Sequence, residues 1–78
     1  MIYCRLQSKN EKFITYSIGA RCSDITGEIR IDSDCKGYEI VKQPHEDKVY
    51  PHFINKMLVR YQHLFNEGKI PEKMSYEI

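Results

Sequence analysis

The spacing of the apolar residues changes once along this chain, and that change limits the fold more than any other feature. Up to Val41, apolar and polar residues alternate, so that they lie on opposite faces of strands. From Val49 the apolar residues recur every three or four positions, which is the period of a helix. A chain of 78 residues has room for one domain. We therefore predict a single α+β domain with a sheet over residues 1–43, a helix over 49–67 and a tail over 68–78.

The alternating half contains four segments in which every second residue faces one way, as in strands that bury one face. The inward set is Ile2, Cys4, Leu6, Ile14, Tyr16, Ile18, Gly27, Ile29, Ile31, Tyr38 and Ile40. Strands that follow one another in sequence usually pair, which predicts an antiparallel meander. The link over 33–37 begins with turn formers and ends in Gly37, which indicates a type I turn closed by a left-handed glycine.

The helical half predicts one amphipathic helix that covers one face of this sheet. Pro51 suits its first turn, and Gly68 suits a left-handed residue just past its end. Eight apolar residues fall within an arc of roughly 140°, namely Tyr50, Phe53, Ile54, Met57, Leu58, Tyr61, Leu64 and Phe65. In the tail Met74, Tyr76 and Ile78 alternate with polar residues, which allows a fifth strand at the sheet edge.

Charge and composition limit where the protein works. The formal net charge is only +1, from twelve basic and eleven acidic residues, whereas proteins that grip nucleic acid through phosphates are usually clearly basic. The first seven residues lack the basic start and apolar run of a signal peptide. No stretch reaches the ~18 apolar residues that span a bilayer. We therefore expect an intracellular, cytoplasmic protein with no membrane partner.

Three short segments are similar to segments of a group of small bacterial proteins to which no function is assigned. They are Tyr16-Ser17-Ile18-Gly19, Asp24-Ile25-Thr26-Gly27-Glu28-Ile29 and Ile70-Pro71-Glu72-Lys73, with a hairpin and a helix between the last two. The similarity covers residues 13–73. It implies a shared fold and no activity, so no functional residue follows from it.

Candidate metal ligands and nucleophiles lack the spacing that their chemistry needs. Zinc sites usually pair ligands two to five positions apart, and no such pair occurs among Cys4, Cys22, Cys35, His45, His52 and His63. Cys4 lies on an apolar strand face, where cysteine usually acts as a small hydrophobe. No phosphate-binding loop, nucleophile motif or spaced acidic pair is present. We expect no metal, no cofactor, no catalytic residue and no enzyme activity.

Two exposed surfaces remain as candidates for binding. One helix covers one face of a sheet, so the other face stays open. On that open face we place Tyr3, Arg5, Phe13, Thr15, Arg30 and Val41, with Tyr3 and Phe13 as a cross-strand pair. The second surface is a basic stripe on the outer side of the helix, formed by His52, Lys56, Arg60 and His63. This stripe gains charge below pH ~6.5 and suits an acidic partner or a nucleic-acid backbone.

These surfaces lead to two functional hypotheses. The first is a protein-interaction module that self-associates through the open sheet face, as a homodimer, or binds a different protein there. Burial of that face would add to the stability of a small core. The alternative is a weak single-stranded nucleic-acid-binding protein. It would use Tyr3 and Phe13 with Arg5 and Arg30, or the basic stripe of the helix.

Overall fold

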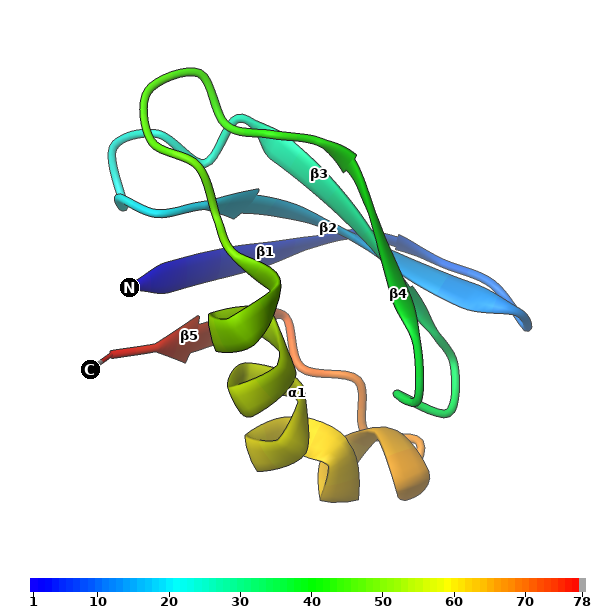
Figure 1. Cartoon of the computed structure of the whole chain (residues 1–78). Coiled ribbons are helices and arrows are strands. Elements are labelled where there is room, and N and C mark those ends of the chain that lie inside the picture. The colour runs from blue at the N-terminus through cyan, green and yellow to red at the C-terminus, as the bar shows by residue number, and fades with distance from the viewer. Residues whose placement is uncertain (78) are drawn as a thin grey trace.

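A five-stranded antiparallel sheet with one helix against it makes up the fold in the computed structural model, which describes residues 1–77 (Figure 1). The elements are β1 (Ile2–Lys9), β2 (Phe13–Gly19), β3 (Gly27–Asp32), β4 (Tyr38–Lys42), α1 (Pro51–Asn66) and β5 (Lys73–Tyr76). The strand order is β4-β3-β2-β1-β5. The predicted α+β class, the four-stranded meander and the fifth strand are therefore confirmed. Ile78, assigned from sequence to the apolar side of the tail, lies outside the described residues.

The core lies between α1 and the inner face of the sheet. Every second residue of β2 and β3 is buried there, as are Ile2 and Cys4 of β1, which confirms the alternation read from sequence, while Leu6 is half-buried. The helix buries Ile54, Met57, Leu58 and Phe65 against them. Tyr50 was expected to face inward, and this was wrong, because its side chain is 57% exposed. Tyr50 is the N-cap residue with extended backbone (φ −112°, ψ 140°), so the helical period does not apply to it.

The turn between β3 and β4 differs from the sequence-based expectation. Its left-handed residue is Cys35 (φ 62°), not Gly37. Cys35 buries its side chain, with its thiol 3.7 Å from the carbonyl oxygen of Leu58, so the backbone bends to bring this residue into the core. At Gly37 a Cβ would lie 2.7 Å from Oδ2 of Asp32, which is the end of an exposed side chain that can move away, so this contact alone does not require glycine.

Two irregularities modify the pairing of the strands. The register of β1 against β2 shifts between Leu6 and Ser8. In β4, Ile40 pairs with Ile29 and Lys42 pairs with Glu28, which leaves Val41 as the extra residue of a bulge.

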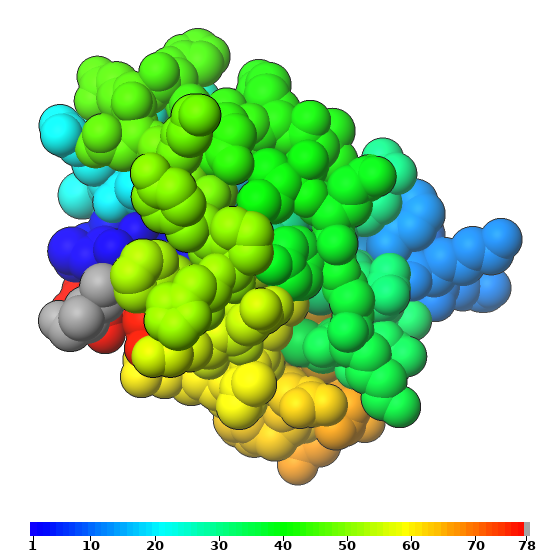
Figure 2. Space-filling view, in the orientation of Figure 1, coloured from blue at the N-terminus to red at the C-terminus, as the bar shows by residue number. Residues whose placement is uncertain are grey.

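The two ends of the described chain lie side by side at one end of the sheet, because Ile2 pairs with Tyr76 (Figure 1). At the opposite end the β1–β2 hairpin extends beyond the rest of the molecule (Figure 2). Within residues 1–77 no helix is long and apolar enough to span a bilayer.

Candidate binding surfaces

The open face does not bring Tyr3 and Phe13 together. Tyr3 pairs with Gly19 at one end of the β1–β2 hairpin, whereas Phe13 pairs with Asp32 at the other end. The two aromatic residues are separated by six positions of β2, or roughly 20 Å at ~3.3 Å per residue. The predicted cross-strand pair is therefore wrong. Its register cannot be read from alternation, because alternation leaves the position of the turn open.

Phe13 lies among charged residues of β3 and β4. The guanidinium carbon of Arg30 lies 4.5 Å from the centroid of the Phe13 ring. The same guanidinium lies 3.9 Å from the carboxylate of Glu39, and Thr15 pairs with Arg30 across β2 and β3. Arg30 therefore covers one side of the ring, and Glu39 offsets part of its charge.

Val41 lies at the edge strand, far from both aromatic residues in the order of the sheet. Arg5 pairs with Ser17, and Ser17 pairs with Glu28, so a row of polar side chains separates Tyr3 from Val41. The six residues assigned to the open face therefore do not form one apolar patch. They divide into a group near Phe13, an isolated Val41, and a group around Tyr3 and Arg5.

The group around Tyr3 and Arg5 lines a groove of about 280 Å³, called here the sheet groove. Its side chains come from β1, from β5 and from the loop over residues 20–26, namely Tyr3, Cys4, Arg5, Cys22, Ile25, Lys73, Met74 and Ser75. Arg5 and Lys73 pair directly across the two strands. Desolvation raises the pKa of the Tyr3 hydroxyl, and the nearby Glu77 and Cys22 add to the shift.

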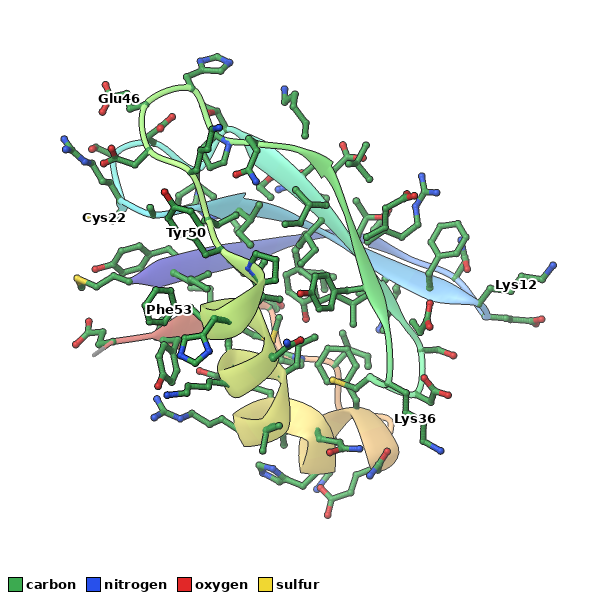
Figure 3. The ribbon with its side chains drawn as sticks, viewed as in Figure 1. Lys12, Cys22, Lys36, Glu46, Tyr50 and Phe53 are labelled. Atoms are coloured by element: carbon green, nitrogen blue, oxygen red, sulfur yellow. The ribbon has the colours of Figure 1, made fainter. Side chains whose placement is uncertain are left out.

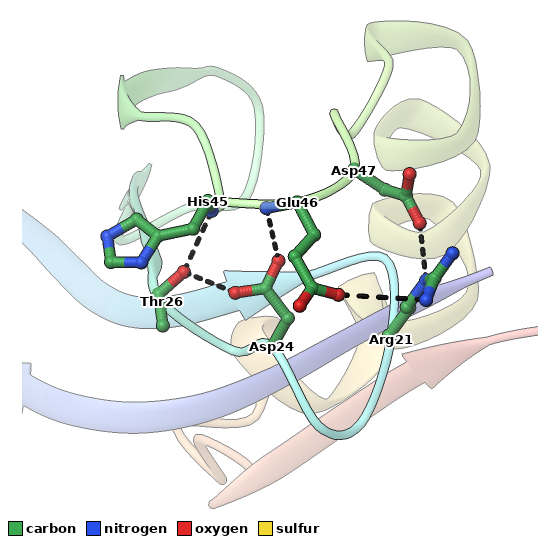
Figure 4. Close-up of polar contacts among 6 residues, drawn as sticks. All are labelled: Arg21, Asp24, Thr26, His45, Glu46 and Asp47. Carbon is green, nitrogen blue, oxygen red and sulfur yellow. Dashed lines mark hydrogen bonds and ion pairs between the residues drawn. The ribbon is translucent and has the colours of Figure 1, made fainter.

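A buried carboxylate holds the loop that forms one wall of the sheet groove (Figure 4). Asp24 accepts a 2.6 Å hydrogen bond from the hydroxyl of Thr26 and a 2.7 Å bond from the N–H of Glu46. The Thr26 hydroxyl in turn accepts a 3.0 Å bond from the N–H of His45. The hydrogen bond from Thr26, followed by that from Glu46, lowers the pKa of Asp24. The 20–26 loop is thereby joined to the segment that leads into α1.

Arg21 adds ion pairs to the same junction. Its Nε lies 2.5 Å from Oδ2 of Asp47, and its guanidinium lies 3.6 Å from Oε2 of Glu46 (Figure 4). The imidazole of His45, considered from sequence as a metal ligand, makes none of these contacts (Figure 4). Sequence reasoning missed this cluster. The Asp24-Ile25-Thr26 pattern indicates a local turn, but its partners are about twenty positions away.

The predicted basic stripe is exposed along α1, and part of it borders a second groove. This groove, called here the helix groove, measures about 420 Å³ and is lined by Asn55, Lys56, Val59, Arg60 and Tyr76. The guanidinium carbon of Arg60 lies 5.0 Å from the centroid of the Tyr76 ring in β5. Val59 is 73% exposed between the two cations. The sequence pattern could not show that Tyr76, from the other end of the domain's second half, would close this groove.

The two histidines of the stripe lie outside the helix groove. The ring of His52 packs edge-on against Phe53, with 5.2 Å between the ring centroids. His63 is in the last turn, where a positive charge is favourable to the helix dipole. The basic stripe is therefore divided, and Lys56 and Arg60 are its members that line a groove.

Cysteine and histidine side chains are scattered through the fold. Cys4 and Cys35 are buried and Cys22 is exposed. Within residues 1–77 no three His, Cys, Asp or Glu side chains come together as metal ligands would. The chain matches no protein-family model and shows no detectable similarity to a curated protein or a solved structure. The sheet groove and the helix groove are therefore the features from which a function can be argued.

Proposed function

We propose that the protein is an interaction module that docks a partner protein in the helix groove, and that the partner presents an acidic segment with an apolar residue at its centre. The exposure of Val59 between Lys56 and Arg60 carries this proposal. An apolar residue flanked by cations, over an aromatic ring, is complementary to an apolar residue flanked by carboxylates.

The charges of the helix groove are free for a partner. Within residues 1–77 neither Lys56 nor Arg60 forms an ion pair, whereas Arg21, Arg30 and Lys69 do. The contact with Tyr76 holds the Arg60 guanidinium at the rim before any partner binds, which lowers the entropy cost of docking. Burial of the exposed part of Val59 would add about 1–2 kcal/mol.

The open sheet face gives less support to the self-association predicted from sequence. A sheet-to-sheet homodimer needs a wide apolar face, and Arg5, Glu28, Arg30 and Glu39 interrupt this one. Edge-to-edge pairing through β5 is also disfavoured. The hydroxyl of Tyr61 accepts a 3.2 Å bond from the N–H of Ser75 and lies 3.4 Å from its carbonyl oxygen, so the helix occupies the free edge there.

Crosslinking from Val59 tests the proposal. A photoreactive phenylalanine analogue at position 59 is expected to form an adduct with one partner in an extract of the native cell. The same analogue at Val41, which is exposed in β4, serves as the positional control. Charge reversal by Lys56→Glu and Arg60→Glu should remove the adduct, and Lys12→Glu with Lys36→Glu should leave it.

The purified partner then provides the quantitative measurement. Its affinity should fall at least about tenfold in the Lys56→Glu, Arg60→Glu variant, and it should weaken as salt rises. Equal adducts from positions 41 and 59, or adducts that survive the charge reversal, would contradict docking in the helix groove. An adduct of twice the chain mass would identify a second copy as the occupant instead.

A further inference from the structure

Two positive charges face each other in the sheet groove, which lies on the face of β5 opposite to the helix groove. Arg5 and Lys73 are direct partners in β1 and β5, and both are exposed. The N–H of Leu6 donates a 2.7 Å bond to the carbonyl of Glu72, so Leu6 and Glu72, the next pair along the two strands, are a hydrogen-bonded pair. Arg5 and Lys73 therefore form a non-hydrogen-bonded pair, in which side chains approach most closely.

This arrangement is unfavourable unless an anion joins it. Like charges directly opposite each other destabilise a sheet, and within residues 1–77 neither Arg5 nor Lys73 forms an ion pair. An anion between them would replace one repulsion with two charge-assisted contacts. A phosphate monoester suits the position because its oxygens accept from both a guanidinium and an ammonium group.

The rest of the sheet groove suits a flat, mostly apolar group beside that anion. Tyr3 lies two residues from Arg5 on the same face of β1, and its ring is half-buried. Ile25 and Cys22 also line the groove, and the Asp24 hydrogen bonds hold their loop in place. The volume of about 280 Å³ lies just below the range of roughly 300–1,000 Å³ that is usual for ligand sites.

We infer that the sheet groove binds a single nucleotide, with its phosphate between Arg5 and Lys73 and its base against Tyr3. The negative charge of Glu77 is close enough to raise the pKa of the Tyr3 hydroxyl. That charge would repel a phosphate beside Tyr3, so the phosphate is favoured beside Arg5. A free mononucleotide and the terminal nucleotide of a single strand share this chemistry. The inference is independent of docking in the helix groove, because the two grooves share no lining residue.

Nuclear magnetic resonance titration of the whole chain tests this site. The probes are adenosine 5′-monophosphate, uridine 5′-monophosphate, a 5′-phosphorylated trinucleotide and inorganic phosphate, at about 20 mM salt so that screening is weak. Amide shifts should concentrate at Tyr3, Arg5, Cys22 and Lys73. Binding by mononucleotides and by the trinucleotide both support the site, and their relative affinities identify the source of the nucleotide.

Matched variants distinguish this site from general attraction to a cation. Arg5→Gln with Lys73→Gln should weaken nucleotide binding at least about tenfold, because two charge-assisted contacts are lost. Lys12→Gln with Lys36→Gln removes the same charge at two hairpin tips, away from Cys22 (Figure 3). That control should change the affinity less than about twofold. Arg5→Lys keeps the charge and should retain binding. Unchanged amide shifts away from the sheet groove in the Arg5→Gln, Lys73→Gln variant exclude misfolding as the cause of the loss.

Cys22 provides a second readout, because it is the exposed cysteine while Cys4 and Cys35 are buried. Bound nucleotide should slow the reaction of Cys22 with a thiol reagent. Three results would overturn the inference: no shifts at these amides with any nucleotide, equal losses in both double variants, or inorganic phosphate bound as tightly as the nucleotides.

Discussion

The hydroxyl of Tyr16 donates a 2.5 Å hydrogen bond to the carbonyl oxygen of Pro71. Tyr16 is in β2, the central strand, and Pro71 lies just before β5. The ring of Tyr16 is fully buried, and burial raises the pKa of its hydroxyl, so the proton stays in place for this bond. One polar contact thus holds the returning chain where β5 can pair with β1.

Tyr16→Phe should destabilise the fold by about 1–3 kcal/mol, because it leaves a half-buried carbonyl without the partner that Tyr16 provides. Urea unfolding followed by circular dichroism measures the change. Tyr50→Phe removes an exposed hydroxyl and serves as the control. Amides of β5 should also exchange faster in Tyr16→Phe. Equal unfolding midpoints for the two variants would show that the Pro71 contact contributes nothing.

Tyr61→Phe should expose the edge of β5. The lost hydroxyl contacts the N–H and the carbonyl of Ser75, so both groups become free to pair with another chain. We expect a loss of about 1 kcal/mol in stability and greater self-association at high concentration. Light scattering on the variant and on Tyr50→Phe measures the association. If the Tyr61→Phe variant stays monomeric at every concentration, the Tyr61 hydroxyl is not needed to keep the edge of β5 from pairing with another chain.

Alkaline pH should destabilise the protein through its buried thiols. Burial raises the pKa of Cys4 from 9.0 to about 12 and that of Cys35 from 9.0 to about 11. Each raised pKa adds to the free energy of unfolding only while the thiol is protonated. This contribution is fully present below pH 9, where the thiol is protonated in the unfolded chain as well. That stability is lost as pH rises toward the folded value, at up to about 1.4 kcal/mol per pH unit for each thiol.

Unfolding under reducing conditions at several values between pH 8 and about pH 11 tests this effect. Cys4→Ala removes one of the two titrations, so its stability should fall less steeply with pH than that of the native chain. Parallel slopes for the two proteins would contradict a raised pKa at Cys4.

Acid should loosen the junction at Asp24. Hydrogen bonds from Thr26 and from the N–H of Glu46 lower the pKa of this carboxyl below 3.8. The resulting stability is present above the unfolded pKa and is lost as pH falls through the lowered folded value. Asp24→Asn cannot titrate, so its unfolding midpoint should depend less on pH between about 5 and 3. An unchanged acid profile in that variant would refute the assignment.

Thr26→Val gives a test of the same junction at neutral pH. The Thr26 hydroxyl donates to Asp24 and accepts from the N–H of His45, so both bonds are lost. The expected cost is about 1–3 kcal/mol, measured by thermal unfolding. Ser23→Val changes an exposed residue of the same loop and should cost little.

Gly68→Ala should cost about 1 kcal/mol, because Gly68 has a left-handed backbone (φ 73°) that a Cβ disfavours. No atom lies within 4 Å of that Cβ, so the cost is conformational and not steric. Gly68→Asn should be tolerated better, since asparagine adopts this conformation more readily. Chemical unfolding of the two variants and of Lys69→Ala measures the difference. Equal stability of all three would contradict this account.

The helix and the strands follow from the sequence because their periods are local. Ile29 and Ile31 alternate with charged residues, and Ile54, Met57 and Leu58 repeat at helical spacing, so each element needs only its own residues to be recognised. Gly68 was identified as the left-handed residue past the helix for the same reason. The turn over residues 33–37 was predicted, but its left-handed residue was assigned to Gly37 and not to Cys35, because a distant contact with Leu58 accompanies the backbone conformation of Cys35.

The candidate sites were only partly predictable. Sequence placed Tyr3 and Arg5 on the open face and Lys56 and Arg60 on the helix, since these positions depend on side-chain direction along one element. It did not pair Arg5 with Lys73 or place Tyr76 beneath Arg60.

By itself the sequence determined which residues turn inward and what class of fold they build, because apolar periodicity acts within each segment. The tertiary structure alone decided which exposed side chains meet, because strand order and register join residues from opposite ends of the chain. β5 is the clearest example. Its pairing with β1 forms the sheet groove on one face, and its contact with α1 forms the helix groove on the other.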